Sequence, residues 1–116
     1  MPFEDSRSHL ADILEAIRSI ERFVEGMSED AYSEDERTQA AVERKLLVIS
    51  EAAFRLKDVA QALCPGVPWR DIRGIGNWLR HGYDRIDAET IWNTVHVDLP
   101  PLKAAVQLAL ESTEAG

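Results

Sequence analysis

Residues 74 to 87, which read GIGNWLRHGYDRID, gather an Asn, two Arg, a His and a Tyr in one short segment. The imidazole of His81 could accept a proton near neutral pH. The guanidinium of Arg80, or else that of Arg73, could hold a phosphate and stabilise charge developing on it, while Asn77 orients the same group. Together these groups are the parts of a metal-independent cleavage of RNA.

Helical geometry decides whether these side chains can act together. At about 100° per residue, one polar face of a helix would carry Arg73, Asn77, Arg80, Asp84 and His81. Asn77 and His81 are four residues apart, so they can touch directly. The ordinary alternative is a solvated face at the end of a core helix, since a His near a helix C-terminus suits the helix dipole. Spacing leaves both interpretations open.

Two glycines lie inside the same predicted helix, where glycine is unfavourable. Gly74 and Gly76 each cost about 1 kcal/mol relative to Ala in a helix interior. Such residues indicate the close approach of another backbone or of a ligand. We therefore expect a neighbour to lie close to this helix at both positions.

Other residues that could do chemistry have simpler interpretations. His9 and His96 lack any Cys, His or paired carboxylate at ligand spacing, so we interpret both as packing or surface residues and expect no metal site. The three tryptophans, Trp69, Trp78 and Trp92, are interpreted as core or interface anchors. Glu51 stands in an apolar helix, where a partly buried acid wants a cation, and an Arg of the third helix is the natural partner.

The elements that must position these residues are helices, and no strand pattern appears. The first helix follows from apolar residues at spacings of three and four between Leu10 and Val24, with Gly26 as its end. Ser33 and Glu36 form a capping box that begins a second helix, whose apolar period continues to Leu63. The predicted class is an all-α, antiparallel up-down helical bundle of four to five helices in one domain, residues 1–116.

Helix-breaking and helix-capping residues predict where the remaining helices begin and end. The segment CPGVP, residues 64–68, stops the second helix. The third is predicted from Trp69 to about His81, with Gly82 as its cap. Asp87 begins a fourth, and Pro100 and Pro101 lie in the first turn of a last helix, where missing amide donors do no harm.

Composition limits the class of protein. The net charge of −8 belongs to residues 1–36, which hold eleven acids and three Arg, whereas the rest balances at ten of each. This argues against nonspecific nucleic-acid binding by the N-terminal third. Cys64 is the single cysteine, which excludes an internal disulfide. With no long apolar run or secretion signal, we expect a cytoplasmic protein that does not enter a membrane.

The second helix is apolar on more than one side. Off its main stripe it also carries Leu47, Val48, Ala52, Phe54 and Val59. A thin bundle with a wide apolar girdle often buries the excess against a copy of itself. We expect a homodimer, and the alternative is that this helix is simply central in the bundle.

The sequence also resembles a known family. IRGIGNWLRHGYDRID followed by IWNTVHVDLPPLKAAV resembles the C-terminal half of HepT-like proteins, which are HEPN domains, and AVERKLLVISEAAFRLK is similar to their second helix. The resemblance covers nearly the whole chain. It implies a dimeric helical bundle with the motif helices in a shared cleft, which acts as the RNA-cleaving toxin of a toxin–antitoxin pair. It also implies a partner, an MntA-type nucleotidyltransferase, that silences the toxin by adenylylating a Tyr of the motif.

The family motif is Arg, four residues, His, one residue, Tyr. His81 and Tyr83 match its last two places, and Tyr83 would accept the adenylyl group. Gly76 falls on the Arg place, and Asn77 matches the Asn that commonly follows it. Arg73 and Arg80 lie about one turn either side of Gly76 and either could replace the missing guanidinium, although phosphate contact depends on direction.

Two functions remain open at this point. In the first, the protein is a metal-independent, cofactor-free RNA endonuclease that cuts a tRNA or an mRNA. In the second, it is a catalytically degenerate HEPN module that binds RNA, a nucleotide or the nucleotidyltransferase without cleavage. Gly76 is the feature that favours the second.

Overall fold

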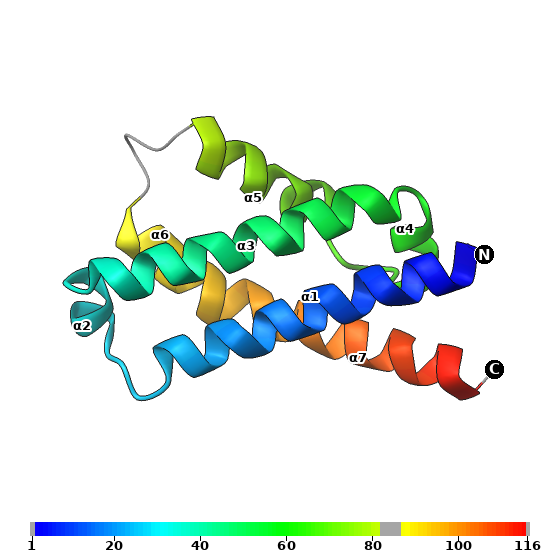
Figure 1. Ribbon diagram of the computed structural model, residues 1–116, viewed down its shortest axis with the longest axis horizontal. Coiled ribbons are helices and arrows are strands. Elements are labelled where there is room, and N and C mark those ends of the chain that lie inside the picture. The colour runs from blue at the N-terminus through cyan, green and yellow to red at the C-terminus, as the bar shows by residue number, and fades with distance from the viewer. Residues whose placement is uncertain (1, 82–86, 116) are drawn as a thin grey trace.

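The computed structural model describes residues 2–81 and 87–115, and within these residues every regular element is a helix. In chain order the elements are α1 (Pro2–Val24), α2 (Glu29–Ser33), α3 (Glu36–Leu56), α4 (Val59–Leu63), α5 (Trp69–His81), α6 (Ala88–Asn93), the π-helix η2 (Thr94–Asp98) and α7 (Leu99–Ala115). Figure 1 shows α1, α3, α5 and α7 running alternately in opposite directions. The expected all-α, up-down bundle is confirmed, although the described residues form more helices than the four to five predicted, because the short helices α2 and α4 were not expected. None of the described helices has the length and apolar character needed to cross a bilayer.

The core is formed where the apolar stripes of the long helices meet. Fully buried side chains include Ile13 and Ile17 of α1, Leu46 and Ile49 of α3, and Val106 of α7. The helix α3 packs against α1 on one side and α5 on the other (Figure 1). Its central position accounts for apolar residues on more than one of its faces.

The off-stripe residues of α3 and α4 divide into two groups. Ala52 is buried, and Leu47 and Val48 are half-buried against the core. Phe54 remains 52% exposed and Val59 is also exposed. The central position of α3 therefore explains the first group but leaves Phe54 and Val59 uncovered in the single chain.

Helix ends follow local capping, with one correction. Gly26 adopts a φ of +75° just after α1, as expected. The capping box assigned to Ser33 and Glu36 is wrong, because Ser33 ends the short helix α2 and Asp35 caps α3 by accepting from the Thr38 amide at 3.0 Å. Asp87 caps α6 as predicted, accepting from the Thr90 amide at 2.7 Å.

The expected continuous helix to Leu63 is also wrong, because the chain bends at Lys57. Lys57 has a φ of +53°, in the left-handed region that residues with a Cβ rarely adopt. α3 therefore ends at Leu56, and α4 begins at Val59 after the bend. The apolar period gave no sign of this break because Leu56, Ala60 and Leu63 continue it in sequence.

The last two helices join without a gap through η2. The amide of Leu99 donates to the carbonyl of Thr94, five residues back, which widens the helix there. Pro100 and Pro101 have no amide hydrogen to donate, so the ordinary bonds of an α-helix are missing in this turn. The two prolines do lie in the first turn of α7, as predicted.

Candidate active site

The helix that carries the candidate residues begins and ends as the sequence predicts, at Trp69 and His81. Its buried side consists of Trp69, Ile72, Gly76 and Leu79, and it packs against α3. Asn77, Arg80 and His81 are exposed at the C-terminal end of α5. We call these three residues the open end.

A second group, which we call the seam, consists of Ser50, Arg73 and Gly76 where α3 meets α5. The buried Ser50 hydroxyl donates to the carbonyl of Arg73 at 2.8 Å and accepts from the amide of Gly76 at 3.1 Å. A Cβ on Gly76 would overlap the Ser50 hydroxyl oxygen, whereas a Cβ on Gly74 would meet nothing within 4 Å. Another helix therefore comes close at Gly76, whereas no described residue comes close at Gly74, where the approach of a ligand stays a prediction.

Arg73 does not lie on the outward face where the helical wheel placed it. Its Nε donates to the carbonyl of Ala53 at 3.1 Å, and its Nη2 donates to the carbonyl of Lys57 at 2.7 Å. The last carbonyls of a helix have no partner within the helix, and a guanidinium can satisfy them. Arg73 is therefore committed to the end of α3, and it is not the candidate that faces a substrate.

Arg80 points back along α5 toward the seam and remains accessible. Its Nη2 lies 3.9 Å from Glu51 Oε1 of α3, and the two side chains are 46% and 44% exposed. The sequence predicts that Glu51 pairs with an Arg of the helix beginning at Trp69, which is α5, and this pair confirms it. The same Nη2 would lie 3.5 Å from a Cβ on Gly76. The Arg80 guanidinium therefore occupies the space beside the position where the family motif has its Arg.

Asn77 and His81 complete the open end. Both are exposed, and no hydrogen bond joins them in the described part of the chain. The structure thus places Asn77, Arg80 and His81 at one end of α5 and leaves the imidazole accessible to a ligand. Tyr83, Asp84 and the predicted cap Gly82 lie outside the described residues.

Ser50 is the residue of this region that sequence reasoning missed. It stands directly before Glu51 in an apolar helix, and nothing in its local pattern distinguishes it from a satisfied helix serine. The unexplained Gly76 was the only available signal, because a glycine wedged against another helix requires a small partner. Among the described residues, no group of three or more His, Cys, Asp or Glu could hold a metal ion.

The three tryptophans and His96 mainly pack against the core or against one another. Trp69 is buried and its indole donates to the carbonyl of Cys64 at 3.1 Å. Trp78 and Trp92 are partly buried against the core, and the exposed His96 stacks on Trp92 with ring centroids 4.0 Å apart. The interpretation of these residues as packing or surface groups agrees with their surroundings.

Comparison with known proteins gives one consistent family. The family model described as Ribonuclease HepT-like matches residues 13–109. A protein named probable ribonuclease HepT from Thermococcus cleftensis is 36% identical over 97 residues, which is 84% of this chain and 88% of that protein. A Methanocaldococcus jannaschii protein with an RNase name is 38% identical over 100 residues, 86% of this chain and 83% of its own length.

A second M. jannaschii protein with an RNase name is 30% identical over 108 residues, covering 93% of this chain and 99% of that protein. No solved structure matches the chain. The family model and the relatives span most of α1 to α7, so the match includes the seam and the described helix that carries the open end. This chain belongs to the HepT-like ribonuclease family of HEPN domains.

Proposed function

We propose that the protein is an RNA endonuclease acting as the toxin of a toxin–antitoxin module, and that the open end of α5 carries the reaction. The observation that supports this most is the position of Arg80. Its guanidinium lies beside Gly76 and is held at 3.9 Å by Glu51 while nearly half of its side chain stays exposed. The Arg80 guanidinium can therefore take the role of the motif Arg, whose place in this chain is occupied by Gly76.

The reaction needs only groups that the open end offers. His81 takes the proton of a ribose 2′-hydroxyl, and the 2′-oxygen attacks the adjacent phosphorus. The bond to the 5′-oxygen breaks, that oxygen takes a proton from water, and a 2′,3′-cyclic phosphate remains. Arg80 stabilises the additional negative charge on the phosphorane-like transition state, and Asn77 orients the phosphate.

A homodimer is part of this proposal. Phe54 and Val59 are apolar and uncovered in the single chain, beside the C-terminal end of α3. Pairing with a second copy would remove this apolar surface from water. It would also bring two open ends toward one RNA strand, as the resemblance to HEPN domains implies.

Silencing by a partner follows from the same resemblance. We propose that an MntA-type nucleotidyltransferase transfers an adenylyl group to Tyr83, with the phenol oxygen attacking the α-phosphorus of a nucleoside triphosphate and pyrophosphate leaving. Tyr83 follows His81 by two residues in the sequence, and in this proposal an adenylyl group on it keeps RNA from the open end. The partner would supply the metal and the triphosphate site.

A second candidate function is a binding module that does not cleave RNA, and the seam favours it. Ser50 fills the space that a side chain at position 76 would need, and Arg73 is committed to carbonyl groups. Of the two candidate arginines, Arg80 is then the one left to stabilise the transition state. If it points away from the reacting phosphate, the domain would hold RNA or its partner without cutting.

One assay separates the two functions. Purified protein is incubated with tRNA and with mRNA in the presence of EDTA, and the ends of the fragments are analysed. The nuclease predicts 2′,3′-cyclic phosphate ends that disappear in His81→Ala and Arg80→Ala but persist in Arg70→Ala, which removes an exposed Arg from the other end of α5. RNA binding without cleavage in the wild type would instead establish the binding module.

The toxin assignment has its own test. Expression should arrest growth, and co-expression of a nucleotidyltransferase encoded beside the gene should relieve the arrest. Mass spectrometry should then find an adenylyl group on Tyr83, and Tyr83→Phe should remain toxic in the presence of the partner. Relief without any modification of Tyr83 would reject adenylylation while leaving the nuclease intact.

A further inference from the structure

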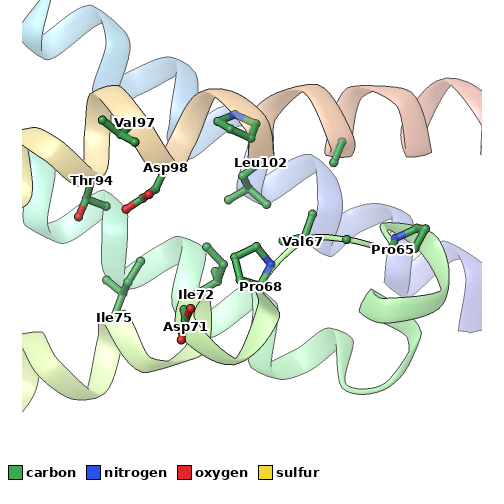
Figure 2. Close-up of a pocket in the computed structure, with 13 residues that line it drawn as sticks. Pro65, Val67, Pro68, Asp71, Ile72, Ile75, Thr94, Val97, Asp98 and Leu102 are labelled. Carbon is green, nitrogen blue, oxygen red and sulfur yellow. The ribbon is translucent and has the colours of Figure 1, made fainter.

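A groove of about 430 Å³ lies at the N-terminal end of α5, whereas the open end is at the C-terminal end of this helix. One wall is the loop after α4 and the first turns of α5, and the other wall is η2 with the first turns of α7. Figure 2 shows Pro68, Ile72 and Ile75 facing Val97 and Leu102 across it. A volume of this size is typical of ligand sites in proteins.

The walls are stiff for reasons that the sequence makes clear. Pro65 and Pro68 fix the backbone of the loop, and Pro101 lies on the opposite wall. The extra residue in the turn of η2 places Val97 on the rim, where it is 64% exposed. A groove with stiff walls loses little conformational entropy on binding, because its shape is set before a ligand arrives.

The groove also has a definite charge. Asp71 stands on the α5 wall and Asp98 on the η2 wall, and both are exposed (Figure 2). Neither carboxylate has an ion-pair partner among the described residues. The groove therefore offers an apolar floor with an acidic residue on each side, and none of the described residues that line it is basic.

We propose that this groove docks a short segment of a partner protein in which an apolar side chain is flanked by Lys or Arg. The apolar side chain lies between Ile72, Val97 and Leu102, and the cations reach Asp71 and Asp98. Lys and Arg suit such a site because their aliphatic stems cover apolar surface while their charged ends remain in water. Charge complementarity of this kind increases the association rate and selects the partner.

RNA is not the occupant that the groove fits. Two carboxylates repel a phosphate backbone, and the lining residues that the structure describes include no Lys or Arg to neutralise it. Asp71 is ten residues before His81 on the same helix, a separation of roughly 15 Å at the rise of an α-helix. A protein segment could therefore occupy the groove while RNA occupies the open end, and the two activities can be tested separately.

The test is a selection from a phage-displayed random-peptide library on the full-length protein, followed by affinity measurements with the selected peptides in synthetic form. We expect selected peptides to combine Leu, Ile, Val or Phe with an adjacent Lys or Arg. Their affinity should fall by about tenfold in Val97→Ser and by about fivefold in Asp71→Asn/Asp98→Asn, with the second effect fading at high salt.

Matched controls exist on the same chain. Leu108→Ser removes an apolar side chain of α7 that is 65% exposed but does not line the groove, and Asp5→Asn/Asp12→Asn removes two exposed carboxylates of α1. Both controls should bind the peptides as the wild type does. All four variants should melt near the wild-type temperature, because the substituted side chains are exposed.

Several results would overturn the proposal. These are the absence of any enriched basic and apolar pattern, or selected peptides that bind the groove variants as tightly as the wild type. Self-association abolished by Val97→Ser but not by Leu108→Ser in sedimentation would assign the groove to a second copy instead. RNA cleavage, where present, should be the same in the groove variants and the wild type, so a failure here leaves the proposed function untouched.

Discussion

The seam and the open end each take an arginine from α5, yet they use these arginines in opposite ways. At the seam, the Arg73 guanidinium satisfies carbonyls of α3 and Gly76 lies against a buried serine. At the open end, the one ion pair of Arg80 among the described residues is with Glu51, and nearly half of each side chain remains exposed. Residue type and sequence spacing therefore do not determine which Arg is available for chemistry. The carbonyl and carboxylate groups that α3 places near each Arg determine it.

Exchanging the two arginines for alanine should give the largest effect. Arg80→Ala should reduce RNA cleavage by about 100-fold, because a charge-stabilising donor is lost. It should change the free energy of unfolding by less than about 0.5 kcal/mol, because the Glu51 pair is exposed. Cleavage rates and urea unfolding curves measure the two quantities.

Arg73→Ala should have a large effect on stability and little effect on cleavage, the opposite of Arg80→Ala. It should lower the free energy of unfolding by about 1–3 kcal/mol, since two carbonyls at the end of α3 lose their donor. Cleavage per folded molecule should hardly change. A reversed pattern, in which Arg73→Ala abolishes cleavage in a fully folded protein, would show that the seam is the reacting region.

Adding a methyl group to each glycine of α5 tests how tight the seam is. Gly76→Ala should lower the free energy of unfolding by about 1–3 kcal/mol because the new Cβ overlaps the Ser50 hydroxyl. Gly74→Ala, which meets open space, should raise it by up to about 1 kcal/mol through helix propensity. Thermal and urea unfolding report both effects.

A rescue variant completes this test. Ser50→Gly should recover part of the stability lost in Gly76→Ala, and the coupling between the two positions is obtained from a double-mutant cycle. Equal effects of Gly74→Ala and Gly76→Ala would mean that the two helices do not approach as closely as described. Gly76→Arg alone should be unstable for the same reason, so a motif Arg is best restored together with Ser50→Gly.

Glu51→Gln should have a smaller effect that appears mainly in cleavage. The amide keeps the shape of the side chain but removes the charge that holds Arg80, so cleavage should fall by roughly threefold while stability changes by less than about 0.5 kcal/mol. Glu43→Gln, on the same helix but outside the seam and the open end, is the matched control. If kcat and KM are unchanged in Glu51→Gln, the ion pair plays no part in positioning Arg80.

The smallest effect concerns the helix on which both regions depend. Bonds from the Thr38 backbone amide and hydroxyl to the Asp35 carboxylate lower its pKa below 3.8. The cap therefore contributes fully above pH 3.8, and its contribution is lost as the pH falls through the lower pKa of the folded state. Asp35→Asn caps without titrating.

The wild type should consequently lose stability relative to Asp35→Asn as the pH falls below 3.8. Urea midpoints of both proteins, measured at a series of pH values on either side of 3.8, test this. Because Ser50 of the seam and Glu51, the partner of Arg80, both belong to α3, we expect the two regions to loosen together in acid. A constant difference between the two proteins at all pH values would show that the cap is not formed.

Much of the fold could be predicted because local signals and tertiary packing agree. The CPGVP segment and the Asp87 cap set the ends of α5 and α6, and they act on the chain next to them. The bend at Lys57 could not be predicted, since a lysine is no turn residue and the apolar period continues across it. Asp35 was overlooked because Ser33 offers an equally good local capping pattern.

The site was predicted less well than the fold for a physical reason. A helical wheel gives the direction of the Cα–Cβ bond, but an Arg side chain is long enough to turn toward a neighbour that the wheel does not contain. The wheel thus grouped Arg73 with Asn77, although Arg73 reaches Ala53 and Lys57 on another helix. Gly76 could be identified as unusual, but only the structure shows that Ser50 is the reason.

The bend at Lys57 opposes the local preference of its own segment. Residues 36–63 are rich in good helix formers, and a straight helix would avoid the strained left-handed backbone, which costs about 1 kcal/mol. The Lys57 carbonyl is held by Arg73, sixteen residues further along the chain. We therefore expect that the helical structure formed by an isolated peptide of residues 36–63 would continue through Lys57, and that the bend forms only when α5 docks.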